Sequence, residues 1–140
     1  MTPTQRRNQL AKYVRALANQ MGMRDWTVTL RPEPPEDSDE GYQTGFGVIA
    51  DSFVPPGQQH AILRMREDVQ MDGDLNYLRE VFVHELVHCL LWPYARTIRT
   101  VKPELSQPTY DVWLDNLKHS EEQAVDQIAR AWAPLLPLPL

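Results

Sequence analysis

Cysteine is nearly absent from this chain of 140 residues, in which Cys89 stands alone. A single cysteine excludes an internal disulfide and a cysteine-rich zinc ribbon. It also favours a reducing compartment, so a cytoplasmic location is expected. Long apolar runs are lacking as well, since no stretch reaches the roughly 20 residues of a membrane-spanning helix and none resembles a secretory signal. The sequence therefore predicts a protein with no membrane partner.

An excess of positive charge is also missing. Lys and Arg number 14 against 19 Asp and Glu, which gives a formal net charge of −5. A general nucleic-acid binder presents a basic face, so no nucleic-acid partner is expected. Hydrophobic residues at 42% and charged residues at 24% are ordinary for a globular protein. A chain of this length fits one domain, which we expect over residues 1–133.

Acidic residues are absent from the first 24 residues, which contain four arginines and one lysine. A start of this kind can be a transit peptide. However, apolar side chains recur at helical spacing from Leu10 to Met21, and the segment runs into the next element without a linker. We therefore expect the first helix of the domain from about Thr4 to Met21, with Thr4 as N-cap and Gly22 as the stop.

Alternation of apolar and polar residues predicts a small sheet. Its three expected strands are Asp25–Leu30, Gly45–Val54 and Gln59–Met65. Pro55-Pro56-Gly57 separates the second strand from the third, so these two are expected to form a hairpin. The acidic, proline-rich segment Pro32–Glu40 is predicted to be a solvated connector, with a lid or partner site as the alternative.

A long apolar run predicts a central buried helix. It follows the turn Asp72-Gly73-Asp74 and extends from about Leu75 to Trp92. Pro93 is expected to limit this helix at its C-terminal end, because proline lacks the N–H group that a helix interior requires. Residues 94–108 contain two further prolines and are expected to be irregular.

The end of the chain is predicted to contain one more helix and a tail. The helix is expected to start between Tyr110 and Ser120 and to run to about Ala133. Residues 134–140 are too rich in proline for a helix, so a flexible tail is expected there.

The central helix carries two histidines four residues apart, in His84-Glu85-Leu86-Val87-His88. On a helix both imidazoles project from one face, so they can hold one Zn²⁺ while Glu85 reaches the water on the metal. A solvated polar stripe is the alternative. It is disfavoured because the motif lies inside an apolar run, Val81–Leu91, where ionisable groups are costly unless they are paired or bind a metal.

A catalytic zinc usually has three protein ligands and one open position, so a third ligand is needed. The metzincin pattern requires Gly at position 91 and His at position 94, and is excluded by Leu91 and Tyr94. The chain instead resembles the gluzincins, the thermolysin-like metallopeptidases, whose third ligand is a Glu on a following helix. In that family an Asp or Asn often follows four residues later, with an apolar residue at plus six. Glu122, Asp126 and Ile128 match this spacing.

Three side chains remain open as the third ligand. Glu121 lies near the middle of the apolar stripe of the last helix, which favours it because a ligand must point inward. Glu122 is the preferred prediction, since Asp126 can then accept the second ring N–H of a ligand histidine and fix its tautomer. His119 is the third option and would resemble a three-histidine site.

The resemblance covers roughly Val81–His88 and Glu122–Ile128 and implies both a fold and an activity. The implied fold is α+β, a minimal zincin-like fold with an N-terminal helix, a three-stranded sheet, a metal-binding helix and a C-terminal helix. Small phage and prophage proteins have this form. The implied activity is that of a zinc metallopeptidase, in which Glu85 acts as general base during hydrolysis of a peptide or protein substrate.

The resemblance also implies where a substrate would bind. In gluzincin-like folds the strand before the metal helix pairs with an extended peptide, which implies His60–Arg66 as the cleft edge. Tyr94, Tyr110 and His119 are candidates to stabilise the oxyanion. The alternatives are a catalytically silent zinc-binding module with a regulatory or interaction role, and hydrolysis of a non-peptide amide.

Overall fold

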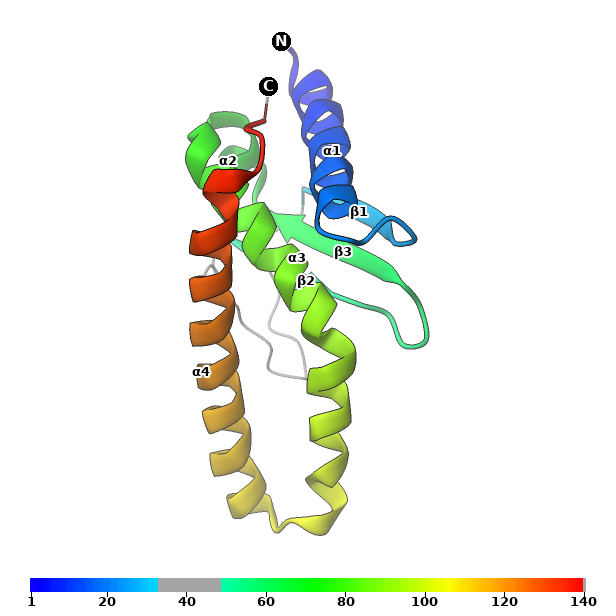
Figure 1. The fold of residues 1–140 in the computed structure, drawn as a ribbon, viewed down its shortest axis with the longest axis vertical. Helices are drawn as coiled ribbons and strands as arrows, with labels where there is room; N and C mark the ends of the chain where they lie inside the picture. The colour runs from blue at the N-terminus through cyan, green and yellow to red at the C-terminus, as the bar shows by residue number, and fades with distance from the viewer. Residues whose placement is uncertain (33–48, 140) are drawn as a thin grey trace.

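The computed structural model describes residues 1–32 and 49–139. It confirms the predicted α+β architecture, with an N-terminal helix, a three-stranded sheet, a long central helix and a long C-terminal helix (Figure 1). In chain order the elements are α1 (Pro3–Gln20), β1 (Thr27–Arg31), β2 (Ala50–Phe53), β3 (His60–Met65), α2 (Glu67–Asp72), α3 (Leu75–Ile98), the 3-10 helix η1 (Arg99–Glu104), α4 (Gln107–Trp132) and the 3-10 helix η2 (Ala133–Leu135).

The sheet has the strand order β1-β3-β2. β2 and β3 are antiparallel neighbours, which confirms the predicted hairpin, and β1 runs parallel to β3 with Thr27 opposite His60. Residues 45–48 of the predicted second strand and 33–40 of the predicted connector lie outside the described residues.

The central place of β3 corrects the prediction for the cleft edge. β1 pairs with one side of β3 and β2 pairs with the other. The backbone N–H and C=O groups of a strand point to its two sides, so a strand paired on both sides cannot accept a further one. The segment His60–Arg66 is therefore not a sheet edge.

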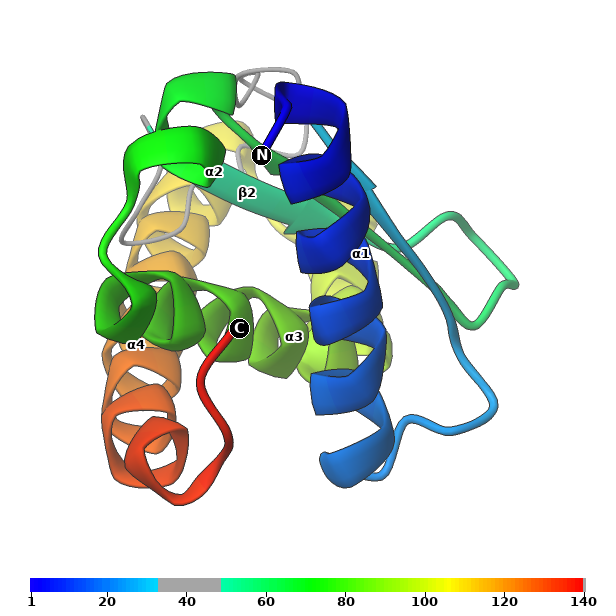
Figure 2. The same ribbon diagram turned by 90° about the horizontal axis from the view of Figure 1, so that it is seen from above.

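One face of the sheet is covered by α1 and α3. The strand residues Ala61, Leu63 and Met65 alternate toward this face and join the main hydrophobic cluster. Figure 2 shows α1 passing in front of α3 and of the strands; α1 contacts β1, and α3 contacts β2. The helices contribute buried side chains at helical spacing, among them Leu10, Val14, Leu17, Leu78, Val81, Phe82 and Leu86.

The N-cap of α1 lies two residues before the predicted one. Thr2, not Thr4, caps the helix, because Thr2 and Gln5 form a reciprocal capping box. The Gln5 backbone N–H donates to Thr2 Oγ1 at 3.2 Å, and the Thr2 backbone N–H donates to Gln5 Oε1 at 2.8 Å. Gly22 is confirmed as the stop, since its φ of +83° is a left-handed conformation that favours glycine.

The prediction that Pro93 ends the central helix is wrong. α3 continues to Ile98 with Pro93 inside it, and η1 follows directly, so residues 94–104 are helical and not irregular. Pro93 removes only one intrahelical hydrogen bond, while Ala95 beyond it is buried. Packing of this kind outweighs a single lost bond.

α4 begins at Gln107, three residues before the predicted range. Ser106 is its N-cap, and Ser106 Oγ accepts a hydrogen bond from the Thr109 backbone N–H. Pro108 in the first turn is no obstacle, because the N–H that it lacks would have no intrahelical partner. Ser106 followed closely by Pro108 was therefore a start signal in the sequence.

The last described residues of the chain contact the body of the fold, and the flexibility of residues 134–140 stays a prediction. Tyr13 Oη of α1 donates a hydrogen bond to the Pro137 carbonyl at 2.6 Å, and Arg79 Nη1 of α3 donates to the Leu136 carbonyl at 2.8 Å. The tail begins with the 3-10 helix η2, and the carbonyls of Leu136 and Pro137 beyond it accept hydrogen bonds from side chains of the body. Among the described residues, no helix has the length and apolar composition needed to cross a membrane.

The connection into α3 contains a short helix, α2, that was not predicted, and a glycine that packing requires. A Cβ atom on Gly73 would lie 2.5 Å from the Val69 carbonyl oxygen and 3.0 Å from the Leu78 side chain. We expect Gly73→Ala to lower the free energy of unfolding by about 1–3 kcal/mol, because α2 or α3 must shift to admit the methyl group. Chemical denaturation measures the change. The exposed neighbour Asp72 provides the control, and a Gly73→Ala protein as stable as Asp72→Ala would contradict the close contact.

Candidate metal centre

Three side chains from the two long helices converge on one point. His84 and His88 belong to α3 and Glu122 belongs to α4, which packs against it (Figure 1). One ligand atom from each side chain lies within 4.8 Å of the others, and the three form a group that could hold a metal ion. The structure thus brings together the three residues that the sequence predicts as ligands.

The separations between these atoms fit a tetrahedral site. His84 Nε2 lies 3.2 Å from His88 Nε2 and 3.4 Å from Glu122 Oε2, while His88 Nε2 lies 2.6 Å from Glu122 Oε1. Ligand atoms about 2.0–2.1 Å from a tetrahedral zinc ion are separated by about 3.3 Å from each other. The separations of 3.2 and 3.4 Å are close to this value, whereas the 2.6 Å separation, which involves the other oxygen of Glu122, is about 0.7 Å shorter.

The other ring nitrogen of each histidine faces a carboxylate. His88 Nδ1 is hydrogen-bonded to Glu121 Oε1 at 3.1 Å, and His84 Nδ1 lies 3.0 Å from Asp126 Oδ1. A carboxyl oxygen beside Nδ1 favours the tautomer in which Nδ1 carries the proton. In the neutral ring Nε2 then presents a lone pair, which is the state that binds a metal.

If the tautomer that Glu121 favours in His88 is also that of His84, only acceptor atoms converge between the two helices. With protons on both Nδ1 atoms, the two neutral Nε2 atoms and the Glu122 carboxylate offer only lone pairs to one another. The histidines are fully buried. Buried lone pairs that face each other repel unless a cation or a proton lies between them. The fixed orientation of both rings therefore suits a cation.

The charges around the histidines alter the ionisation of the site. Burial alone would lower the pKa of His84, but the carboxylates of Glu122, Glu85 and Asp126 outweigh it and raise that pKa above its ordinary value. Burial alone would raise the pKa of Glu122, but its contacts with His84 and His88 lower that pKa to about 2. Burial, followed by the charge of Glu122, raises the pKa of Glu121 to about 8.

The structure separates the three candidates for the third ligand. Glu122 faces the Nε2 atoms of both histidines, whereas Glu121 faces only Nδ1 of His88, on the outer side of the ring. His119 is exposed on α4 and does not belong to the ligand group among the described residues. Asp126 contacts His84, as expected from its position four residues after Glu122.

The contact between Glu121 and His88 was not predicted. The sequence signal for it is the inward position of Glu121 on the helical wheel, which was taken as a reason for direct ligation. An inward carboxylate next to the ligand can equally face the outer nitrogen of the same histidine, because His88 lies between two consecutive residues of α4.

Glu85 follows His84 directly in α3. Its side chain is fully buried, and its charge acts on both His84 and Cys89. The Cys89 thiol is hydrogen-bonded to Ser52 of β2, so this side of α3 faces β2. Glu85 is thus a buried carboxylate of α3 whose charge acts on the candidate ligand His84 and on Cys89, which is on the side of α3 that faces β2.

Two of the three oxyanion candidates lie away from the ligand group along their helices. At 1.5 Å per residue, Tyr110 lies about 18 Å along α4 from Glu122, and Tyr94 lies about 9 Å along α3 from His88. Tyr94 is also 69% exposed, and Tyr110 stacks near Trp113 with a ring-centroid distance of 6.1 Å. An oxyanion role for these tyrosines stays a prediction.

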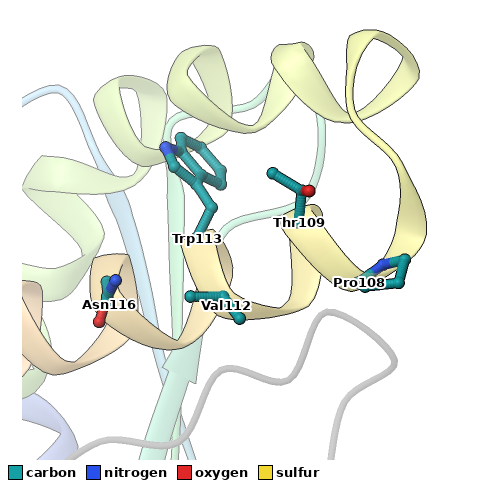
Figure 3. Close-up of a pocket in the computed structure, with 5 residues that line it drawn as sticks. All are labelled: Pro108, Thr109, Val112, Trp113 and Asn116. Atoms are coloured by element: carbon teal, nitrogen blue, oxygen red, sulfur yellow. The ribbon is translucent and has the colours of Figure 1, made fainter.

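An open cavity of about 500 Å³ lies on the first half of α4 (Figure 3). Its lining residues are Pro108, Thr109, Val112, Trp113 and Asn116. These residues precede Glu122 by 6 to 14 positions, which is about 9–21 Å along the helix. The cavity is therefore separate from the metal centre.

Comparisons of the chain with models of protein families, with curated proteins and with solved structures found no match. The functional argument therefore depends on the residues and geometry of the site itself.

Proposed function

We propose that this chain is a zinc-dependent metallopeptidase with His84, His88 and Glu122 as the metal ligands and Glu85 as the general base. The observation that supports the proposal is the convergence of three buried or half-buried acceptor atoms beside a fully buried fourth side chain that can accept a proton. The motif and the spacing of Glu122 and Asp126 resemble those of the gluzincins, which supports the same reading.

The ligand set favours zinc among the biological cations. Two imidazole nitrogens and one carboxylate oxygen form a common catalytic zinc site, whereas Mg²⁺ and Ca²⁺ prefer oxygen ligands alone. A zinc ion held by these residues supplies a Lewis acid that polarises the substrate carbonyl and makes water more acidic.

Glu85 would perform the proton transfers. Its carboxylate takes a proton from the attacking water while the water oxygen bonds to the carbonyl carbon of the substrate. When the C–N bond breaks, Glu85 returns this proton to the leaving amine, so the residue ends each turnover in its starting state. His84 and His88 need only keep their orientation, which their contacts with Asp126 and Glu121 maintain.

The proposal is tested by metal content together with hydrolysis of a peptide mixture. We expect about one zinc ion per chain in protein purified without chelator, because the site offers a single ligand group. Chelation is expected to abolish cleavage, and zinc is expected to restore it, with Mg²⁺ as the control metal. Peptide products are detected by mass spectrometry.

Two results would overturn the proposal in different ways. A folded chain that neither contains nor takes up zinc would exclude the metal centre. A chain that holds one zinc ion but cleaves no peptide in the mixture would instead favour the catalytically silent module, since the ligands would then serve structure or interaction alone.

A further inference from the structure

We propose that Glu121 is a positioning residue for His88 and that it contributes more to zinc affinity than Asp126 does. This inference deepens the proposed function and rests on the metal centre described there. The evidence is the position of Glu121 on the outer nitrogen of a ligand histidine, together with its burial inside the packed interface of α3 and α4.

The two contacts on the outer nitrogens differ in quality. Glu121 Oε1 is hydrogen-bonded to His88 Nδ1 at 3.1 Å, and the exposed fractions of the two side chains are 8% and 2%. Asp126 lies as close to His84, at 3.0 Å, but its side chain is 35% exposed. Water can replace an exposed acceptor and retain most of the interaction, whereas nothing can replace a buried one.

The position of Glu121 is one where an apolar residue would pack better. Val125, one turn further along the same face of α4, is fully buried, as is Ala129 after it. A carboxyl group in such a stripe carries a desolvation cost that a leucine would avoid. Glu121 therefore lowers the stability of the metal-free fold. This is typical of a residue that serves function and not folding, here the binding of the metal.

The ring of His88 is held from both ends by consecutive residues of one helix. Glu121 contacts Nδ1 and Glu122 contacts Nε2, at 3.1 and 2.6 Å. Without Glu121 the ring can flip or rotate and can carry its proton on Nε2, and both changes withdraw the lone pair from the metal. The acceptor oxygen is the feature required, so an amide oxygen at the same place is expected to suffice.

Zinc affinity of the full chain, measured by competition with a chromophoric chelator, tests this role. Glu121→Leu is expected to bind zinc about 10–100-fold more weakly, as is usual when the partner of a ligand histidine is lost. Glu121→Gln keeps an acceptor and is expected to restore most of the affinity. Asp126→Leu is expected to lose less zinc affinity than Glu121→Leu does. Glu104→Leu is the control, because Glu104 is exposed in η1.

Two further measurements distinguish positioning from a merely structural role. The absorption spectrum of the Co²⁺-loaded chain reports the geometry of the ligands. We expect this spectrum to shift in Glu121→Leu and to match that of the unaltered chain in Glu121→Gln. Unfolding of the metal-free chains is expected to show that Glu121→Leu is at least as stable as the unaltered protein.

Each contrary result overturns the inference. Unaltered zinc affinity in Glu121→Leu removes the role of Glu121 but leaves the metal centre intact, while no zinc binding by the unaltered chain removes both. Equal losses in Glu121→Gln and Glu121→Leu would show that charge and not orientation matters. A weaker metal-free fold in Glu121→Leu would reduce Glu121 to a structural residue.

Discussion

Glu85→Gln is expected to lower the rate of peptide hydrolysis about 10²–10⁴-fold, the usual contribution of a general acid–base group. Glutamine has the same shape as glutamate, so the packing of this fully buried side chain is preserved. Its amide cannot accept the proton of the attacking water. The turnover number, measured on a peptide found to be cleaved by the unaltered chain, is therefore expected to fall while zinc content stays near one ion per chain.

The matched control for this substitution is Glu104→Gln. Glu104 is exposed in η1, far along the chain from the metal centre, so the same chemical change there is expected to leave turnover unaltered. Normal hydrolysis by Glu85→Gln would refute its role as general base. A loss of zinc together with activity would instead show that the Glu85 carboxylate helps to hold the site.

Loss of either His88 or Glu122 is expected to weaken zinc binding about 10²–10³-fold. Structural zinc sites with four protein ligands bind with about 10–16 kcal/mol, or roughly 3–4 kcal/mol for each ligand. His88→Ala and Glu122→Ala each remove one of the three convergent atoms, and the remaining two cannot complete the site. Competition with a chelator of known affinity measures the change.

His119→Ala is the control that decides between the candidate ligands. His119 is exposed on α4, three residues before Glu122, and the structure places it outside the ligand group. We expect its removal to leave zinc affinity unchanged. If His119→Ala lost zinc and Glu122→Ala retained it, the third ligand would be His119 and not Glu122. Circular dichroism of the metal-free variants establishes that each remains folded.

Local patterns predicted most of the secondary structure. Helical periodicity gave α1 and most of α3, and alternation gave the strands, because burial of one face imposes these periods on any sequence. The errors are at the helix ends. Pro93 is predicted to end α3, but the helix continues to Ile98. The prolines of residues 94–108 predict irregular structure, although α4 begins at Gln107. A proline removes one hydrogen bond from a helix, and the free energy gained by tertiary packing exceeds this loss.

The two candidate ligand histidines were also predictable as a pair, because they lie on a single helix. A separation of four residues places His84 and His88 on one face of α3 whatever else the fold does. The third candidate ligand is harder to predict than the histidine pair, because it lies on another helix. Glu121 and Glu122 are neighbours about 100° apart on α4, and which of them reaches the Nε2 atoms depends on the rotation of α4 against α3.

The sequence by itself determined most of the long elements, the helix face that carries the histidines and the small set of acidic residues that could join them. Only the tertiary structure decided that Glu122 meets both Nε2 atoms and that Glu121 faces His88 from the other side. It also decided that β3 lies in the middle of the sheet. The physical reason is the range of the interactions. Periodicity and capping act over a few residues, whereas helix rotation and strand order are set by packing between segments far apart in the chain.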